Sequence, residues 1–280
     1  MFENTGTTDI TTLVAFPLPE LPARYESPIN VAYPEAGNFV GFQVWVDGRE
    51  IKPDIEVRAF DKDREVAGEL KRLGVNPVQP ILSDKAVIGR LRDLNLVEGD
   101  DDPFALWTVN VSFHWSQVFP AGKQITVRHR YRPIYGGRYS PVDANDRVRF
   151  NKENQSLGGS WCLDKSFNDA ELRLFDRQYD AAARSKGRSA TDFMVWCENV
   201  EYILKTGANW QGAIGRFELQ IDKRGADLIS ICPIPGLTLQ RAPYGFNAVA
   251  TDYMPVSNLD ILFVSGHFLG RPDGSEVQTK

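Results

Sequence analysis

The sequence contains little cysteine and no long apolar run, and each absence excludes classes of protein. No window of the 280 residues approaches the roughly 18 consecutive apolar residues of a transmembrane helix. The three cysteines, Cys162, Cys197 and Cys232, are spaced 35 residues apart, unlike the C-x-x-C pairs of zinc sites and thioredoxin-like proteins. They allow one disulfide with one leftover thiol, or three buried thiols in a reducing compartment.

Several catalytic signatures are also missing. The phosphate-binding patterns GxxxxGK[ST] and GxGxxG do not occur, so a nucleotide site is not indicated, and we expect no cofactor. There is no G-x-S-x-G nucleophile elbow, because the segment 158–162 (GGSWC) lacks the second glycine spacing and a strand-to-helix context. A Ser/His/Asp triad is defined by its arrangement in space, so a hydrolase stays open as the alternative function.

An excess of positive charge is absent as well. The formal net charge is -5 and the pI is near 5.4, so the phosphate attraction on which nucleic-acid binders depend is not expected. In the basic cluster at 128–132 (RHRYR), arginines recur at every second position, which is typical of the solvent-exposed face of a strand. The opening residues, MFENTG, lack the basic and apolar regions of a signal peptide. Taken literally, that start predicts a cytoplasmic protein.

What the sequence does contain is a succession of short β-strand patterns. The segment 9–21 (DITTLVAFPLPEL) has two largely apolar or β-branched faces, which predicts a strand covered on both sides and ended by its prolines. The segment 38–60 is typical of a hairpin that turns at Asp47-Gly48. Alternation from Trp107 to Trp115 predicts a further strand, with 124–131 as its hairpin partner.

Helical periodicity interrupts these strands at about 63–73, 83–95 and 166–186, where apolar residues recur every three or four positions. Glycine, proline and serine concentrate between residues 133 and 159, which indicates a boundary. We therefore expect a mainly β fold, α+β at most, with two β-sandwich-like halves of antiparallel strands. Residues 1–133 form the first domain with a helical insert, and residues 134–280 form a second, mostly β domain with one long helix.

One candidate for chemistry is His114. The alternation places it away from the face of Trp107 and Trp115, with Asn110 and Ser112 as neighbours. There it could contact a ligand or act as a general base, and the simpler interpretation is an isolated surface histidine without a nucleophile.

A second candidate is an acidic loop, whose hard carboxylate oxygens suit calcium. It has no EF-hand pattern, and such loops are usually only solvated; its members are Glu98, Asp100, Asp101 and Asp102. No other metal site is indicated.

The third candidate is the glycine-rich loop 206–215 (TGANWQGAIG). Asn209 and Trp210 could present a hydrogen-bonding and stacking pair to a ligand such as a sugar. The alternative is a tight turn in which the tryptophan fills the end of a sandwich.

Four strings give the chain a recognisable resemblance. In order and spacing, it resembles the bacterial domain of unknown function numbered 4424 through the following strings: TTLVAFPLPEL, NFVGFQVWVDGREIKP, LWTVNVSFHWSQVFPAGKQITVRHRYRP and YILKTGANWQGAIGRFELQID. The first half is also distantly similar to the vault protein and inter-alpha-trypsin (VIT) domain, which implies a β-sandwich. The second half has no Asp-x-Ser-x-Ser string, so it does not continue as a von Willebrand-type metal domain.

The resemblance has consequences for compartment and for the cysteines. Members usually begin with a secretion signal, so the chain is expected to lack its natural beginning and to act in the periplasm or cell exterior. Disulfides persist there. Because SWCLD and ISICP resemble the cysteine positions of the family and VWCEN does not, the implied disulfide joins Cys162 to Cys232, and Cys197 is expected to be a small buried residue.

These observations favour a non-enzymatic binding or scaffolding module of the bacterial envelope. Its partner would be an unknown envelope protein or glycan, with neither nucleic acid nor a membrane span involved. The alternative is an envelope hydrolase that uses His114 with unidentified partners.

Replacing Trp210 with alanine separates the two interpretations of the glycine-rich loop. If the indole fills a sandwich end, the melting temperature should fall by several degrees, because truncating a buried tryptophan costs about 3–5 kcal/mol. If the indole contacts a ligand, binding to envelope glycans should be lost with an unchanged melting curve. We expect the first result. Thermal melts and glycan-binding assays on the same preparation decide between them.

Overall fold

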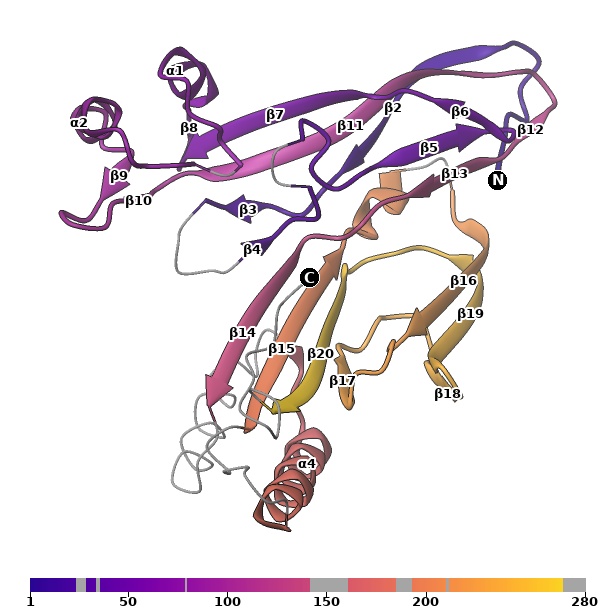
Figure 1. Ribbon diagram of the computed structural model, residues 1–280. Coiled ribbons are helices and arrows are strands. Elements are labelled where there is room, and N and C mark those ends of the chain that lie inside the picture. Colours follow the sequence, from indigo (N-terminus) through magenta and orange to yellow (C-terminus); the bar gives the residue numbers. More distant parts are fainter. Residues whose placement is uncertain are drawn as a thin grey trace. The chain divides into compact units, whose positions relative to one another are not determined.

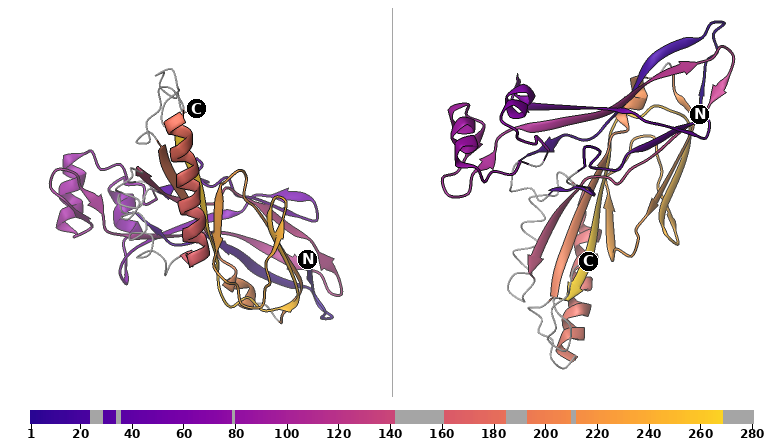
Figure 2. Two further views of the ribbon diagram at one scale, coloured as in Figure 1. Left: turned by 90° about the horizontal axis from the view of Figure 1, so that it is seen from below. Right: turned by 45° about the horizontal axis from the view of Figure 1, so that its top comes forward.

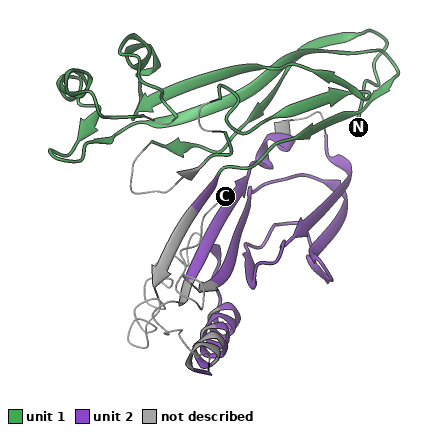
Figure 3. Cartoon of the chain, in the orientation of Figure 1, with its two compact units in different colours: residues 1–134 green, residues 135–280 purple. Residues whose placement is uncertain are grey.

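The computed structural model describes residues 1–23, 29–33, 36–78, 80–141, 161–184, 193–209 and 212–268. Its contacts divide the chain into two compact units, residues 1–134 and 135–280 (Figure 3). Both are built mainly from antiparallel strands (Figure 1). A mainly β fold is thus confirmed.

The first unit contains many strands and two short helices. Its elements are β1 (Phe2–Glu3), β2 (Ile10–Pro17), β3 (Leu21–Pro22), β4 (Ile29–Asn30), β5 (Gln43–Val46), β6 (Arg49–Ile51), β7 (Asp54–Asp61), β8 (Arg64–Glu65), α1 (Ala67–Arg72), α2 (Lys85–Asp93), β9 (Val97–Glu98), β10 (Phe104–Ala105), β11 (Thr108–Phe119), β12 (Gln124–Ile125) and β13 (Val127–Arg130).

Two sheets of the first unit share one hydrophobic core. One sheet has the strand order β2-β11-β7-β8, and the other has the order β13-β5-β6. Strand β11 buries every second side chain from Val109 to Trp115, as the alternating sequence predicts. Phe42, just before β5, stacks on Phe113 with ring centroids 4.4 Å apart, and α1 and α2 add buried leucines to the same core.

The partners of the long strand differ from the prediction. Residues 124–131 do not pair with β11: β12 pairs with β1, and β13 pairs with β5. The two edges of β11 are instead taken by β2 and β7. Pairing between segments far apart in sequence satisfies the same alternation as a hairpin does, so the period alone could not choose the partner.

Strand β2 is also less covered than expected. It was predicted to be buried on both faces, but residues 10–13 are exposed. It pairs with β11 on one side and ends its sheet, so no described residue pairs with its outer edge.

The helices of the first unit are shorter than predicted. Residues 63–73 were expected to be helical, but α1 begins at Ala67, because Arg64 and Glu65 form β8 after a turn at Lys62, whose φ is 55°. The helix ends as predicted, before Gly74 with a φ of 69°. Asp84 caps α2, because its carboxylate accepts hydrogen bonds from the N–H groups of Ala86 and Val87.

The second unit has two sheets and a long helix. Its elements are β14 (Tyr135–Pro141), α4 (Lys165–Arg184), β15 (Phe193–Tyr202), the 3-10 helix η2 (Lys205–Asn209), β16 (Ile214–Asp222), β17 (Leu228–Ile231), β18 (Gln240–Ala242), β19 (Gly245–Tyr253) and β20 (Leu259–Phe268). The helix α4 corresponds to the one predicted at about 166–186.

One sheet of this unit is covered on both faces. It contains β17-β20-β15-β14 in that order. Val195, Leu262 and Val264 pack with Phe167 of α4 on one face. On the other face, Leu259 and Ile261 pack with residues of the second sheet, which has the order β16-β19-β18. In Figure 1, α4 lies beside the ends of β15 and β20, and the left view of Figure 2 shows this helix lengthwise. None of the helices in the described ranges combines the length and apolarity needed to span a membrane.

The packing of His129 makes the stability of the first unit sensitive to pH. Its ring lies 4.5 Å from that of Phe16 and 5.8 Å from that of Phe42. The residue as a whole is exposed to solvent, but desolvation of the imidazole beside these rings lowers its pKa from the ordinary value. The folded state therefore favours the neutral imidazole. The contribution of His129 to the free energy of unfolding is fully present above its unfolded-state pKa, near 6.5. This contribution is lost as the pH falls through that value toward the lower folded-state pKa.

Replacing His129 with phenylalanine keeps a ring in this cluster and removes the titration. We expect the wild type to lose more stability than His129→Phe between pH 7.5 and pH 5.5, because only the wild type must keep its imidazole neutral. Urea unfolding at both pH values measures the difference, since all other groups titrate in both proteins. Equal losses would show that the Phe16 and Phe42 contacts do not disfavour the charged ring.

Candidate functional site

The residues singled out from the sequence do not converge on one place. His114 lies in β11, between Ala15 of β2 and Asp54 of β7, on the face opposite to Trp107 and Trp115 as predicted. Neither Asp54 nor Ser112 makes a hydrogen bond with it in the described part of the chain. The arrangement holds no described nucleophile–base–carboxylate chain of the kind a hydrolase needs.

The acidic loop lies between β9 and β10. Glu98 ends β9, and Arg92 reaches into the loop from α2: its guanidinium donates to the carbonyl oxygens of Gly99 at 2.6 Å and Asp100 at 3.2 Å. These are oxygens that a calcium ion in the loop could use. Across the described ranges, no group of three or more His, Cys, Asp or Glu side chains is placed to hold a metal ion.

The glycine-rich loop is described only in part. Asn209 ends η2, and Trp210 lies outside the described residues. The suggestion that the two contact a ligand stays a prediction.

The second unit contains a concave site that the sequence did not reveal. It is a cavity of about 480 Å³ between the start of α4, strand β17, and the segment that holds β18 and the start of β19. Its volume is within the range of small-molecule sites. The lining residues are Cys162, Asp164, Ser166, Phe167, Ala170, Lys223, Asp227, Leu228, Ile229, Ser230, Ile231, Leu239, Arg241, Ala242, Pro243, Gly245 and Phe246.

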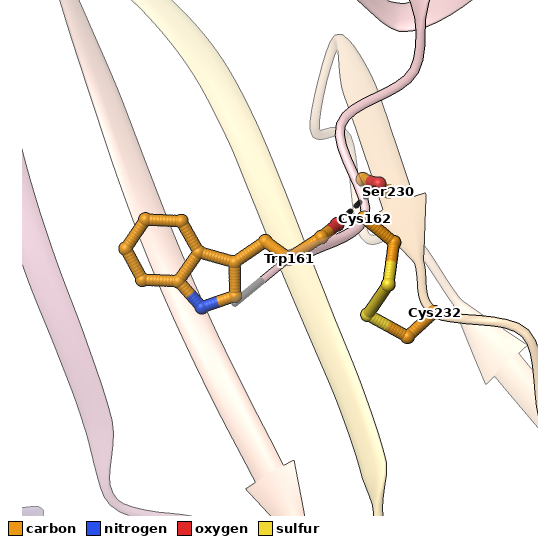
Figure 4. Close-up of a disulfide and its surroundings, with 4 residues drawn as sticks. All are labelled: Trp161, Cys162, Ser230 and Cys232. Carbon is orange, nitrogen blue, oxygen red and sulfur yellow. Dashed lines mark hydrogen bonds between the residues drawn. A yellow bond between two sulfur atoms is a disulfide. The ribbon is translucent and has the colours of Figure 1, made fainter. Parts of the chain in front are cut away.

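A disulfide holds one wall of this cavity. Cys162 precedes α4, Cys232 follows β17, and the two form a bond with their Cα atoms 5.1 Å apart. The Ser230 hydroxyl of β17 donates to the carbonyl oxygen of Trp161 at 2.9 Å, so a covalent and a polar contact fix the same short segment to the same strand (Figure 4). The pairing implied by the family resemblance is confirmed, and Cys197 is buried and lies outside the disulfide, as predicted.

The two acidic residues at the rim already serve the fold. Asp164 caps α4, because its carboxylate accepts hydrogen bonds from the N–H of Phe167 at 2.8 Å and the hydroxyl of Ser166 at 2.7 Å. These bonds, led by the one from Phe167, lower the pKa of Asp164. The carboxylate of Asp227 accepts a hydrogen bond from the N–H of Gly266 at 2.9 Å.

The two basic residues at the rim have no such role. Arg241 of β18 pairs with Phe246 of β19, which pairs with Ile221 of β16. Residues in one cross-strand row share a face, so Arg241 lies on the inner face with Phe246, and Lys223 follows Ile221 by two positions. Within the described residues, neither cation makes an ion pair or a side-chain hydrogen bond. Both are therefore available to an anionic group.

Strand β17 presents its free edge to the cavity. The N–H of Cys232 donates to the carbonyl oxygen of Asp260 at 3.3 Å. In an antiparallel ladder such pairs alternate along the strand, which makes Ser230–Leu262 the next hydrogen-bonded pair of this register. The N–H and C=O groups of Ile229 and Ile231 consequently point away from β20, where no described strand pairs with them.

Gly245 allows the opposite wall to close. A Cβ atom at this position would collide with the carbonyl oxygen of Ile221, so only glycine lets β19 begin this close to β16. The lining is mixed, with apolar side chains such as Phe167 and Phe246 beside two available cations and open backbone groups. The cavity is therefore suited to a ligand that is apolar in part and carries a negative charge.

Only faint signals for this site are present in the sequence. Its polar residues come from three separate stretches of the sequence, 162–170, 223–231 and 239–246, and in its own stretch each is an ordinary polar or charged residue. Leu239 and Arg241 are two positions apart, so in a strand they lie on the same face. This spacing could have indicated a strand with an inward cation. Nothing local could have placed Lys223 beside it.

Comparison with known proteins gives a family and no activity. The sequence matches the family described as a domain of unknown function, DUF4424, over residues 1–262, and the chain belongs to this family. No curated protein matches it. A Legionella pneumophila structure, provisionally assigned as a nutrient binding protein, has 13% sequence identity and a TM-score of 0.35 to this chain. The match covers 93% of this chain and 57% of that one, so this chain spans little more than half of that protein, and a similarity this low supports no conclusion about function.

Removing the disulfide tests how strongly it constrains the second unit. In the chain-entropy model, opening a loop whose ends are 70 residues apart costs about 4 kcal/mol of unfolding free energy. We expect a Cys162→Ala, Cys232→Ala variant to show a loss of that size in urea unfolding, and the reduced wild type to match it.

Cys197→Ala is the matched control, because it removes the third sulfur and leaves the bridge intact. It should lose roughly 1 kcal/mol, as a typical core substitution does. If the double variant unfolded at the same urea concentration as the oxidised wild type, the bridge would not constrain the fold.

Proposed function

We propose that this DUF4424 member is a non-enzymatic binding protein of the bacterial envelope, and that the cavity beside the Cys162–Cys232 disulfide holds its ligand. The ligand is an envelope component with an apolar part and an anionic group. The observation that carries the proposal is the combination of a cavity of about 480 Å³, lined by both polar and apolar residues, with two cations, Lys223 and Arg241, that have no described partner.

The charge arrangement supports an anionic ligand. Asp164 and Asp227 accept hydrogen bonds from protein groups, so their negative charges are partly compensated by the fold. A carboxylate, sulfate or phosphate group on the ligand would give Lys223 and Arg241 charge-assisted hydrogen bonds, which are roughly twice as strong as neutral ones. The apolar part would cover Phe167, Phe246 and the isoleucines of β17.

The compartment is part of the proposal and rests on the disulfide. Bridges of this kind form and persist in oxidising environments such as the periplasm and are rare in the cytosol. A bridge that shapes the ligand cavity would make binding depend on export. A periplasmic or extracellular location is proposed from this argument and from the secretion signal with which members of the family usually begin.

The division of the chain is also proposed to be functional. Residues 134–280 would act as the ligand-binding domain, and residues 1–133 as a VIT-like β-sandwich domain. The two sheets of the first unit, packed around one core, are consistent with such a sandwich.

Charge reversal at the rim tests the binding site. The probe is 8-anilinonaphthalene-1-sulfonate, an apolar anion whose fluorescence rises on binding, with decanoate as competitor. We expect Arg241→Glu and Lys223→Glu each to weaken binding by about ten- to a hundredfold, because each removes a charge-assisted hydrogen bond of about 1.5–3 kcal/mol. Arg177→Glu, on an exposed part of α4 outside the cavity, is the control for the change in net charge.

The outcome separates a specific site from general dye adsorption. Weakening at Arg241 and Lys223, with Arg177→Glu unchanged and decanoate displacing the dye, supports the cavity. Equal affinity of all variants, or a dye signal that decanoate does not reduce, would contradict the proposal.

A further inference from the structure

The first unit carries an open sheet edge at β2 (Ile10–Pro17). The strand pairs with β11 along its whole length, and in the described part of the chain its other edge has no partner. Long, uncharged edge strands are unusual in natural proteins, because they template pairing with further strands and are normally blocked by charges, prolines or bulges. Residues 10–16 (ITTLVAF) contain none of these.

The hydrogen-bonding groups at this edge can be assigned from the register. The N–H of Leu18 donates to the carbonyl oxygen of Val111 at 2.9 Å, and the same register pairs Phe16 with Phe113. Alternation along the ladder makes the even-numbered residues of β2 the ones bonded to β11. Thr11, Leu13 and Ala15 therefore direct their N–H and C=O groups outward.

Apolar side chains accompany these backbone groups. Leu13 is 64% exposed and Ile10 is 49% exposed. On the neighbouring strand β11, Val118 pairs with Thr11 of β2 and is 47% exposed. Such values are high for large aliphatic residues on a regular strand, where one face normally packs against the core.

We propose that this edge pairs with the β2 edge of a second copy of the chain, antiparallel and around a two-fold axis at Leu13. The uncharged window of residues 10–16 is centred on Leu13, so reversal maps it onto itself. Thr11 then faces Ala15 of the copy, and Leu13 faces its own equivalent. The outward backbone groups meet in three hydrogen-bonded pairs, each with two N–H···O=C bonds.

The ends of the strand favour this register over shifted ones. Pro17, which has no N–H, closes the edge on one side. On the other side Asp9 directs its carboxylate to the N–H of Ala121, at 2.9 Å. A shift would oppose these end residues to the apolar window, whereas the centred register keeps them outside it. The contact is isologous, which is the commonest arrangement of homodimers.

The absence of charge in the window explains why a second copy is the occupant chosen. A basic or acidic strand would find no opposite charge at this edge, while an identical uncharged window loses no charge solvation on pairing. The net charge of -5 on each chain opposes association at low ionic strength, and physiological salt screens that repulsion over about 8 Å.

Sedimentation equilibrium of the full chain tests the dimer. At physiological salt and up to about 1 mM protein, where a contact with a Kd near 1 mM is still populated, we expect a reversible monomer–dimer equilibrium. Leu13→Lys should shift it to monomer, because it places two ammonium groups opposite each other across the axis. Val249→Lys is the control, since Val249 is a similarly exposed aliphatic residue, at 56%, on β19.

A second variant tests the backbone pairing itself. Ala15→Pro removes an outward N–H and leaves the ladder to β11 intact, so it should weaken the dimer at least tenfold with an unchanged melting curve. A wild type that stays monomeric throughout would overturn the proposal. So would a dimer that survives both Leu13→Lys and Ala15→Pro, because it would use another surface, and so would pairing of β2 with a different protein in place of the second copy.

Discussion

The second unit depends on one covalent constraint, the disulfide between Cys162 and Cys232. It ties the segment before α4 to the end of β17, and the Ser230–Trp161 hydrogen bond adds a second tie at the same point. The start of the helix is thereby held beside the edge of the sheet. Without the bridge, α4 would rest on apolar contacts such as that of Phe167 with the β15 and β20 valines, and one wall of the cavity would be free to move.

Each unit has one strand with an open edge, and we propose different roles for the two edges. At β17 the outward groups of Ile229 and Ile231 face a cavity whose rim also carries Lys223 and Arg241, which suits a ligand that combines hydrogen bonds with charge. At β2 the outward groups face solvent beside exposed Leu13, which suits another strand. In both places unpaired backbone groups next to apolar surface mark where the fold is incomplete by itself.

Local features were predictable from the sequence, and long-range ones were not. The alternation of β11, the Asp47-Gly48 turn and the stop of α1 at Gly74 are set by neighbouring residues. The predicted partner of β11 was wrong, because strand pairing is decided by loops and packing far along the chain. The Cys162–Cys232 pair came from family resemblance, since spacing alone left the connectivity open. The cavity escaped prediction because its polar residues are unremarkable until β16, β18 and α4 are brought together.

The most direct test of the Cys162–Cys232 bridge is to count the free thiols in the protein isolated from its native cells. Alkylation of denatured, unreduced material followed by intact mass determination counts them. One labelled cysteine, mapped to Cys197, is the predicted result, because the bridge must exist where the protein works if it shapes the binding cavity. Three labelled cysteines would contradict the bridge in the cell, and with it the proposed compartment and the fixed wall of the site.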